Sequence, residues 1–353
     1  MSRRPVAIVV GSFAGLVVTA VAATTIVGCA LSGPGWHGPP SDHFDGQRFQ
    51  NLRPITQGGF GRFLRWRWSR HPTPWVDRND PPGPPPPRQV SGGGMRVTFV
   101  NHATVLVQMD GINVLADPIW SERASPFSWI GPRRHRPPGL RFEDLPPIDA
   151  VILSHNHYDH MDLATLQRLR ARHYPRFFTG LGNKAILERE GIGPVVELDW
   201  WQASALKGEV SIEAVPTQHF SGRGLFDRDE ALWEGFVLRG PAGMAYLAGD
   251  TGAGPHFAEI RKRLGAPRLA VLPIGAYQPE WFMSGVHQSP AEAVQAADLL
   301  GAGTSVAIHF GTFALADDGQ DDPPARLAAA LAAHPAPDPR FWVLGFGEGR
   351  DVP

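Results

Sequence analysis

The chain has 353 residues, of which 42% are hydrophobic and 19% charged, so it is able to bury a sizeable core. Its 33 Lys and Arg balance 34 Asp and Glu, and a formal charge of -1 gives no global attraction to nucleic acid. The single cysteine, Cys29, excludes an intramolecular disulfide framework and a cysteine-rich zinc site. We therefore expect a globular protein without a nucleic-acid partner, whose oligomeric state stays open.

The N-terminus carries a short basic end followed by an apolar run over residues 6–27. These are the parts of a secretory signal. The run ends Ile26-Val27-Gly28-Cys29, which resembles the lipobox of bacterial lipoproteins, and this resemblance implies lipidation of Cys29. An uncleaved transmembrane anchor is the alternative, because about 20 apolar residues also span a bilayer. We expect residues 1–28 to be a signal peptide or anchor, and the protein to be tethered to a membrane of the cell envelope, facing the periplasm or the exterior.

Residues 29–95 form a Pro/Gly-rich N-terminal extension. A proline-rich run at 81–87 and three glycines at 92–94 predict extended, flexible segments. Between residues 60 and 75, aromatic side chains alternate with arginines. This mixture suits a membrane interface or a phosphate-bearing ligand, and it equally suits an extension that packs its aromatic side chains on the main domain.

From residue 95 onward the patterns are regular. Runs rich in apolar and β-branched residues predict strands, and Asp110-Gly111 predicts a hairpin turn between two of them. The predicted strands are 95–100, 103–109, 112–116, 150–153, 195–198, 210–215, 235–238, 245–248, 270–274, 305–308 and 341–344. Helical patterns cover 162–172, 255–264, 290–300 and 324–333. Early hairpins followed by alternating strands and helices indicate a mixed α/β domain over 96–350.

A cluster of metal-binding residue types directly follows the predicted strand 150–153. The segment 154–160 reads Ser-His-Asn-His-Tyr-Asp-His. Imidazole and carboxylate groups at this density suit zinc, and iron or manganese almost as well. Because side chains at i and i+2 of an extended segment point to one side, His155 and His157 are placed to grip one ion. Asp159 and His160 are then placed to face a second ion.

Further ligand candidates follow other predicted strands. His219 comes after 210–215, Asp250 after 245–248 and His309 after 305–308. Open α/β sheets place their ligands at strand ends, so this recurrence predicts that the separate residues join the cluster.

HxHxDH followed by a separate His, Asp and His resembles the metal signature of the metallo-β-lactamase superfamily. The resemblance implies an α/β fold, the four-layered αβ/βα sandwich, with two zinc ions at one edge of the sheets. It implies that the first zinc is held by His155, His157 and His219, the second by Asp159, His160 and His309, and that Asp250 bridges them. No cysteine ligand is present, which separates the chain from the β-lactamases that use one.

Longer segments are similar to the N-acylphosphatidylethanolamine-hydrolysing phospholipase D group. They include residues 101–107, Asp117-Pro118-Ile119-Trp120, Gly249-Asp250-Thr251-Gly252, 272–277 and 309–313, and the similarity extends over about 41–347. This resemblance implies a phosphodiesterase whose substrate is a phospholipid or another phosphodiester at a membrane surface. The alternatives are a metal-dependent lactonase or esterase of a small phosphorylated or sugar-like substrate, and a surface lipoprotein with structural metals.

The predicted mechanism is attack on phosphorus by a hydroxide shared between two zinc ions. Asp250 and Asp159 are the predicted catalytic carboxylates, and by resemblance His287 touches substrate or donates a proton to the leaving alcohol. Further predicted substrate-binding residues are Tyr158, Gln218 and Tyr277. Asp162 is expected either to orient a ligand imidazole or to stand at the start of a helix. His102, among apolar β-residues, is expected to be structural.

Overall fold

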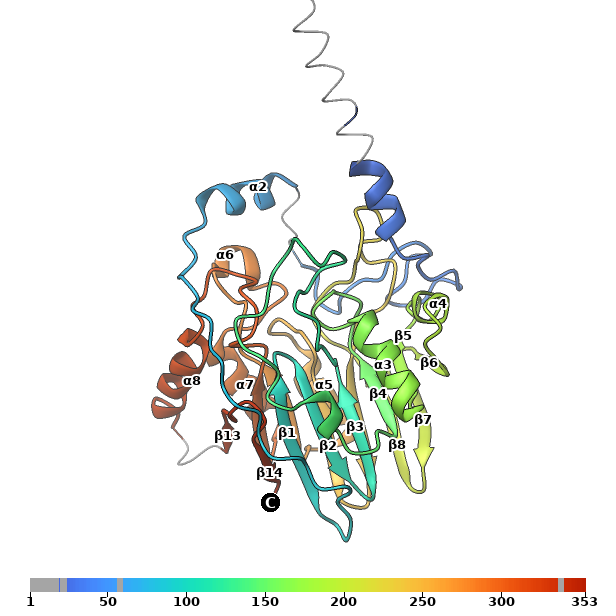
Figure 1. The fold of residues 1–353 in the computed structure, drawn as a ribbon, viewed down its shortest axis with the longest axis vertical. Coiled ribbons are helices and arrows are strands. Elements are labelled where there is room, and N and C mark those ends of the chain that lie inside the picture. Colours follow the sequence, from blue (N-terminus) through green and yellow to red (C-terminus); the bar gives the residue numbers. More distant parts are fainter. Residues whose placement is uncertain (1–18, 20–23, 56–59, 336–339) are drawn as a thin grey trace, which may run out of the picture.

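Two seven-stranded sheets face each other in the computed structural model, which describes residues 19, 24–55, 60–335 and 340–353 (Figure 1). The first sheet has the strand order β14-β1-β2-β3-β4-β5-β6 and the second β13-β12-β11-β10-β9-β8-β7. In each sheet an antiparallel portion adjoins a parallel one: β1, β2 and β3 pair antiparallel, whereas β3 through β6 pair parallel. The carboxyl ends of several parallel strands therefore meet at one edge of each sheet.

The strands of the first sheet are β1 (Met95–Asn101), β2 (Thr104–Met109), β3 (Ile112–Ala116), β4 (Ala150–Leu153), β5 (Arg176–Gly180), β6 (Val195–Leu198) and β14 (Gly349–Asp351). The second sheet contains β7 (Ala203–Lys207), β8 (Val210–Val215), β9 (Gly235–Gly240), β10 (Gly243–Leu247), β11 (Leu269–Pro273), β12 (Thr304–Ile308) and β13 (Phe341–Trp342). Asp110 and Gly111, between β2 and β3, have φ angles of 50° and 73°, as a two-residue hairpin turn requires. The predicted hairpin is confirmed.

Helices cover the outer faces of both sheets. On the first sheet, Leu166 and Leu169 of α3 (Leu163–His173) cluster with Val151 and Phe177. That face also carries α4 (Lys184–Arg189), while α5 (His256–Leu264), α7 (Pro290–Leu300) and α8 (Asp322–Ala332) lie on the second sheet. Shorter elements are α6 (Glu280–Met283) and the 3-10 turn Phe142–Asp144. The order helices, sheet, sheet, helices confirms the four-layered α/β sandwich.

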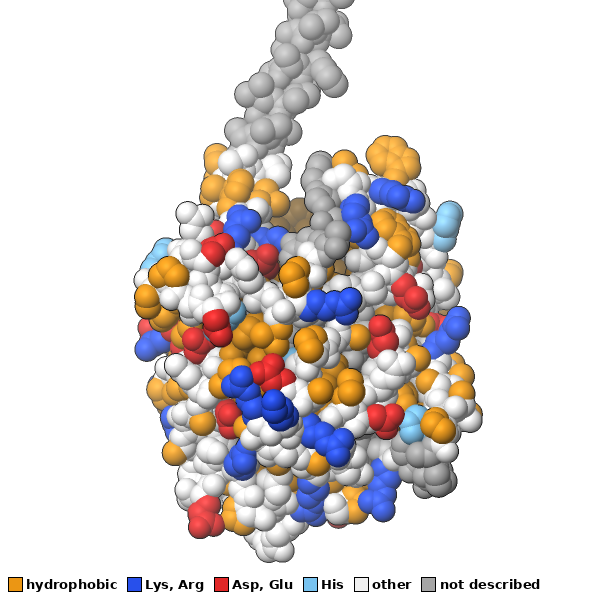
Figure 2. Space-filling view, turned by 180° about the vertical axis from the view of Figure 1, so that it is seen from behind, with side chains coloured by type: hydrophobic (Ala, Val, Ile, Leu, Met, Phe, Trp, Pro, Cys, Tyr) orange, Lys and Arg blue, Asp and Glu red, His pale blue; other side chains and the backbone are white. Residues whose placement is uncertain are grey.

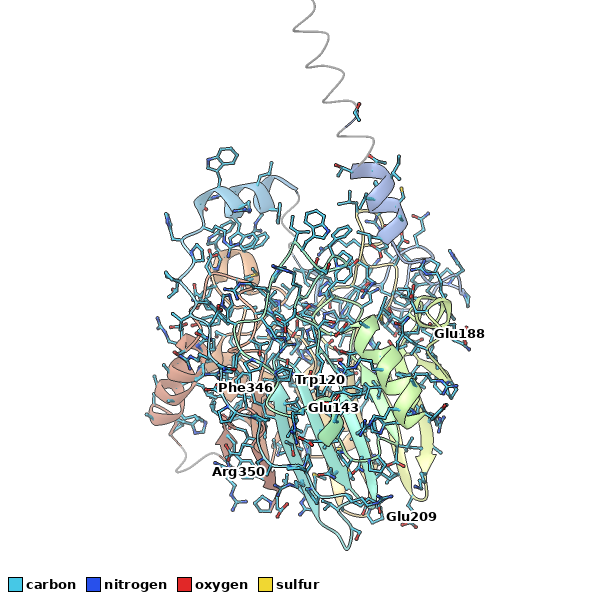
Figure 3. All side chains as sticks on the ribbon, viewed as in Figure 1. Trp120, Glu143, Glu188, Glu209, Phe346 and Arg350 are labelled. Atoms are coloured by element: carbon cyan, nitrogen blue, oxygen red, sulfur yellow. The ribbon has the colours of Figure 1, made fainter. Side chains whose placement is uncertain are left out.

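The main core lies between the two sheets. Fully buried side chains from the first sheet, such as Phe99 and Val107, belong to the same cluster as Phe236, Leu238 and Leu272 from the second. The inward alternation of apolar residues along each strand produces this layer. At the far end from α2, Figure 3 shows Glu209 near the turn between β7 and β8.

The N-terminal extension, for which no helix was predicted, contains α2 (Phe60–Ser69). Trp66 of α2 is buried and stacks on Phe282 with ring centroids 5.2 Å apart. Trp75 donates from Nε1 to the carbonyl of Asp318. The extension thus packs part of its aromatic side chains on the main domain, and the proposed boundary at residue 95 remains a prediction.

The predicted signal peptide or anchor falls mainly outside the described residues. Residues 24–31 are helical, and Cys29 is exposed. Within the described ranges, no helix has both the length and the apolar character needed to cross a membrane.

Helix α7 begins with a capping box. Ser289 Oγ accepts from the backbone N–H of Glu292 at 3.3 Å, Glu292 Oε2 accepts from the N–H of Ser289 at 2.7 Å, and Pro290 occupies the first turn. We expect Ser289→Ala to destabilise the protein by about 1 kcal/mol, because a helix N–H loses its acceptor. The shift of the urea unfolding midpoint measures this, with the exposed Ser128→Ala as control; an equal shift in both variants would refute the cap's contribution.

Candidate metal centre

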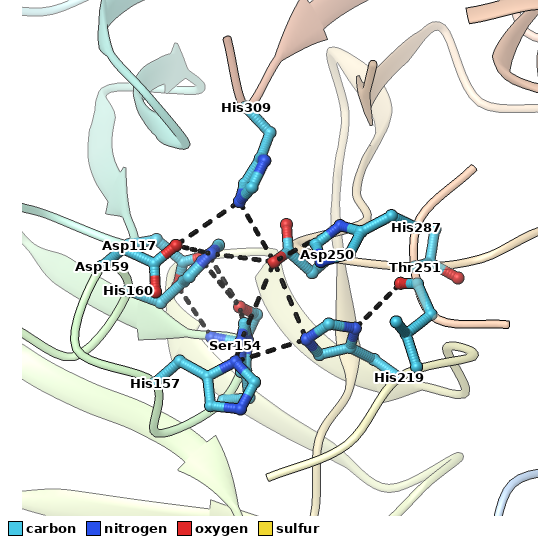
Figure 4. Close-up of polar contacts among 12 residues, drawn as sticks. Asp117, Ser154, His157, Asp159, His160, His219, Asp250, Thr251, His287 and His309 are labelled. Carbon is cyan, nitrogen blue, oxygen red and sulfur yellow. Dashed lines mark hydrogen bonds and ion pairs between the residues drawn. The ribbon is translucent and has the colours of Figure 1, made fainter. Parts of the chain in front are cut away.

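All the predicted ligands gather at one edge of the paired sheets (Figure 4). The loop 154–160 follows β4 of the first sheet. His219, Asp250 and His309 follow β8, β10 and β12 of the second sheet, after short connections. Adjacent strand ends therefore bring together residues that are far apart in the sequence, as the strand-end argument predicted.

The first group consists of His155, His157 and His219. His155 Nε2 lies 2.8 Å from His157 Nδ1, and His219 Nε2 lies 3.4 Å from the same atom. Ring nitrogens that face each other at these distances need a proton or a cation between their lone pairs. Burial is the main cause that lowers the pKa of all these imidazoles, to about 4 for His157, which favours the neutral form that binds metal.

The second group lies around two carboxylates. Asp159 Oδ2 is 3.4 Å from both His160 Nε2 and His309 Nε2. Asp250 Oδ2 is 3.2 Å from each of the same nitrogens, 3.7 Å from His219 Nε2 and 4.0 Å from His155 Nε2. One oxygen of Asp250 thus lies between the two groups of imidazoles, which is the position that a bridging ligand requires.

The donor set fits divalent metal ions. Buried atoms without a hydrogen-bond partner include His160 Nε2, His309 Nε2 and Asp250 Oδ1. Leaving such atoms unpaired away from water is costly, so several orphaned ligand atoms at one point indicate a site for a cation. Mixed imidazole and carboxylate ligands match the preferences of zinc and of other transition metals.

Charge also favours a cation here. Burial alone would raise the pKa of Asp250, but the charges of His309 and His160 hold it well below its ordinary value. For Asp159, the charge of His160 and a hydrogen bond from His102 outweigh burial in the same way. Both carboxylates are therefore ionised and attract positive charge.

A layer of hydrogen bonds orients the ligands, and the sequence interpretation missed its main member, Asp117. This residue follows β3, beside β4, and its Oδ2 accepts from His160 Nδ1 at 2.8 Å. It also accepts from the N–H and the Oγ of Ser154, at 2.8 and 2.7 Å. The hydrogen bond at Nδ1 of His160 keeps Nε2 of the same ring directed toward the cluster. Asp117 follows a predicted strand, as the other candidate ligands do, and this position in the sequence could have identified it.

His219 is held from two sides. Its Nδ1 donates to the carbonyl of Val286 at 2.9 Å. Asn51, in the N-terminal extension, bonds the backbone of His219 twice: Nδ2 donates to its carbonyl at 2.8 Å, and Oδ1 accepts from its N–H at 3.0 Å. No sequence pattern indicated this role of Asn51.

Near the cluster, one sequence interpretation needs correction and one pair of alternatives is resolved. His102 is not merely structural, because its Nε2 donates to Asp159 Oδ2 at 2.9 Å, inside the candidate metal group. Asp162 does not orient a ligand imidazole: it stands at the N-cap of α3, and its carboxylate accepts from Ser121, Trp120 and Thr165. Its alternative position, the helix start, is the observed one.

Unusual backbone geometry concentrates at this edge. His102, Asp117 and His309 all have positive φ angles, between 40° and 65°. Gly249, which precedes Asp250, has φ 61°, and a Cβ there would lie 2.3 Å from Ser154 Cβ. Glycine is therefore required at that turn, whereas the strained non-glycine residues are of the kind that clusters at functional sites.

A cleft of about 1120 Å³ opens above the cluster. His157, Asp159, Asp250, His287 and His309 line it. Its walls are mainly apolar and come from Phe63 and Trp66 of α2, Trp281, Phe282 and Met283 of α6, and Phe220, Leu225, Val286 and Leu315; Arg53, Arg62 and Arg228 add positive charge. Figure 2 shows a hollow at this end of the molecule, with hydrophobic side chains on both sides.

Of the predicted substrate-binding residues, two line the cleft and two do not. Gln218 and His287 line it, and His287 Nδ1 lies 4.0 Å from Asp250 Oδ2. Tyr158 does not line the cleft: it lines a separate cavity and its hydroxyl donates to the carbonyl of Arg223, so its substrate-binding role remains a prediction. Tyr277 does not line the cleft either, because it is buried beside α8 and donates to Asp322.

The fold and this set of side chains define a metal-dependent hydrolase. A family model described as a beta-lactamase superfamily domain matches residues 112–310, more than half of the chain. The chain therefore belongs to the metallo-β-lactamase superfamily.

Among curated proteins, the chain is similar to N-acyl-phosphatidylethanolamine-hydrolyzing phospholipase D 1 of Caenorhabditis elegans, with 40% identity over 63% of this chain and 65% of that protein. It is 33% identical to the mitochondrial N-acyl-phosphatidylethanolamine-hydrolyzing phospholipase D of Saccharomyces cerevisiae, over 65% of this chain and 50% of the relative. The chain thus spans less than two thirds of the length of either relative. A metallo hydrolase from Ignicoccus hospitalis shares the fold, with a TM-score of 0.55, 22% identity and coverage of 73% of this chain and 98% of that chain.

Proposed function

We propose that this hydrolase is a binuclear zinc phosphodiesterase of the phospholipase D type, acting on N-acylphosphatidylethanolamine-like lipids. The observation that carries the proposal is the cleft above the metal cluster, which combines a large volume, apolar walls and arginines. Apolar walls suit acyl chains, and guanidinium groups suit a phosphate. A small phosphorylated sugar would instead need a narrow basic pocket.

In this proposal, His155, His157 and His219 hold one zinc ion, Asp159, His160 and His309 hold the other, and Asp250 is shared between them. Zinc ions at these positions would supply Lewis acidity and lower the pKa of water toward neutrality. Asp117 and the carbonyl of Val286 keep the ring nitrogens of His160 and His219 aimed at the cluster.

The remaining residues position the substrate. His287 lines the cleft beside Asp250 and would hydrogen-bond to the phosphate or to the leaving oxygen. Water adds to phosphorus, the bond from phosphorus to the ethanolamine oxygen breaks, and that oxygen takes a proton. The products are a phosphatidic acid and an N-acylethanolamine.

Two further observations support the proposal. The relatives from Caenorhabditis elegans and Saccharomyces cerevisiae carry this activity in their names. Cys29 is exposed on the helical segment 24–31, so lipidation there, or an uncleaved apolar run, would tether the enzyme to a membrane of the cell envelope.

The test is to purify the full chain in mild detergent, measure its metal content and assay two phosphodiesters. N-acylphosphatidylethanolamine in mixed micelles is compared with the soluble bis(p-nitrophenyl) phosphate. We expect two zinc ions per chain, loss of activity with a chelator and its return with zinc. In isotopically labelled water, the label is expected in phosphatidic acid and not in the N-acylethanolamine.

The outcomes separate the hypotheses. Metal-dependent cleavage of the soluble diester without lipid cleavage would remove the lipid substrate and keep the phosphodiesterase. Bound metal with neither diester cleaved would refute phosphodiesterase activity, and a chain that binds no metal would refute the whole proposal.

A further inference from the structure

Large apolar side chains are exposed at the end of the molecule where the cleft opens. We call six of them the apolar rim: Leu64 and Trp68 of α2, Trp129 and Ile130 of the loop 121–134, and Leu225 and Phe226 of the loop 220–231. Trp68 is 90% exposed and Trp129 72%. Several large apolar side chains exposed at one end of a protein indicate an interaction site.

The segments of the rim lie at one end of the molecule. Figure 1 shows α2, α6, the loop 121–134, the loop 220–231 and the helical residues 24–31 together at the upper end. Packing links them: a Cβ added at Gly28 would lie 2.5 Å from Leu225 Cδ1. Ala30 and Leu31 share a cavity with Arg123 and Phe127 of the loop 121–134.

The rim continues into the cleft. Leu225 belongs to the apolar rim and also lines the cleft. Helix α2 likewise contributes to each, because Phe63 lines the cleft and its neighbour Leu64 is part of the rim. Trp281, which is also exposed, lines the mouth. An acyl chain that enters over Leu225 and α2 would therefore pass from the apolar rim to the apolar part of the cleft wall.

Positive charge accompanies this surface. The sequence of α2 contains Arg62, Arg65 and Arg67 and no acidic residue. The guanidinium groups of Arg62 and Arg65 lie 5.6 and 5.1 Å from the ring centroid of Trp281. Aromatic side chains mixed with arginines match the boundary between anionic headgroups and acyl chains.

We infer that the apolar rim inserts into the interface of an anionic phospholipid bilayer, so that the cleft opens directly onto the membrane. The predicted membrane-attached run, residues 6–27, continues into the helical residues 24–31, which lie at this same end of the molecule. A lipid substrate then enters the cleft sideways without crossing water. The functional role of this contact rests on the proposed lipid substrate. The contact with the bilayer itself can be measured without catalysis.

The test uses tryptophan fluorescence of the full chain, reconstituted into vesicles of phosphatidylcholine and phosphatidylglycerol. Lipids brominated in the acyl chains quench only those tryptophans that reach them. We expect Trp68→Phe and Trp129→Phe each to remove part of the quenching, and the double variant to lose most of it. The matched control is Trp342→Phe: Trp342 lies under the guanidinium of Arg350, which Figure 3 shows at the end away from α2.

Quenching in the double variant equal to that of the unaltered chain would overturn the inference, because the rim would then face water. A stable dimer that shields Trp68 and Trp129 from brominated lipid would overturn it as well. This readout needs no catalysis, so it stands even if no lipid is hydrolysed. Where lipid is hydrolysed, the Trp68→Ser, Trp129→Ser double variant is expected to cleave vesicle-borne substrate about tenfold more slowly. Its rate on bis(p-nitrophenyl) phosphate should be unchanged.

Discussion

Replacing Asp250 by asparagine is expected to lower kcat/KM by roughly a thousand-fold or more and to release metal from the purified protein. Asp250 Oδ2 lies between the two groups of imidazoles, 3.2 Å from His160 Nε2 and His309 Nε2 and 3.7 Å from His219 Nε2. The amide keeps the size of the side chain but removes the charge that attracts both cations. Metal analysis and bis(p-nitrophenyl) phosphate kinetics on the same sample measure the two effects.

The matched control for this substitution is Asp227→Asn. Asp227 is also a buried carboxylate, but it accepts from the backbone N–H groups of Gly33 and Gly224, away from the cluster. We expect this variant to lose stability and to keep its metal. An Asp250→Asn enzyme that retains full metal content and near-normal rates would refute the shared-ligand role.

The second large effect is expected from Asp117→Asn, which should lower metal affinity or activity by about 10–100-fold. Asp117 accepts from His160 Nδ1 at 2.8 Å and from the N–H and Oγ of Ser154. An asparagine amide nitrogen cannot accept a hydrogen bond, so the ring of His160 would lose part of its orientation. Zinc affinity, measured by competition with a chromophoric chelator, reports this loss independently of turnover.

Asp162→Asn is the natural comparison for Asp117→Asn. Both carboxylates are buried next to the ligand loop, yet Asp162 contacts Ser121, Trp120 and Thr165 and not a ligand imidazole. Asp162→Asn is expected to reduce stability with little change in zinc affinity. If the two substitutions weakened zinc binding equally, the positioning role of Asp117 would have to be abandoned.

Much of the fold could be predicted because its signals are local. The strands 150–153, 195–198 and 210–215 and the helix 290–300 have the bounds of β4, β6, β8 and α7. Short apolar runs flanked by turn residues mark these strands, and Ser289-Pro290 at one end and Gly301 at the other mark the helix. Conversely, β7 was missed because its residues are half-exposed or exposed and carry little apolar signal.

The candidate ligands could be predicted because a compact motif and its strand-end partners need no knowledge of the packing. The groups that orient them depend on contacts between distant positions: Asn51 and His219 are 168 residues apart, and Asp117 and His160 are 43 apart. That Tyr158 and Tyr277 do not line the cleft could not be predicted for a related reason, since the direction of a side chain depends on the loop that carries it.

The contacts of Asn51 show that the region matched by the family model does not contain every residue that supports the ligands in this chain. The family model matches residues 112–310, whereas the backbone of His219 is held by a residue far upstream of that region. The same Asn51 Oδ1 also accepts from Trp233 Nε1 at 3.0 Å, so it joins the loop of His219 to the start of β9. A relative that shares only the matched region must support this ligand in another way, and divergence of the N-terminal segment can therefore alter metal binding while every ligand stays unchanged.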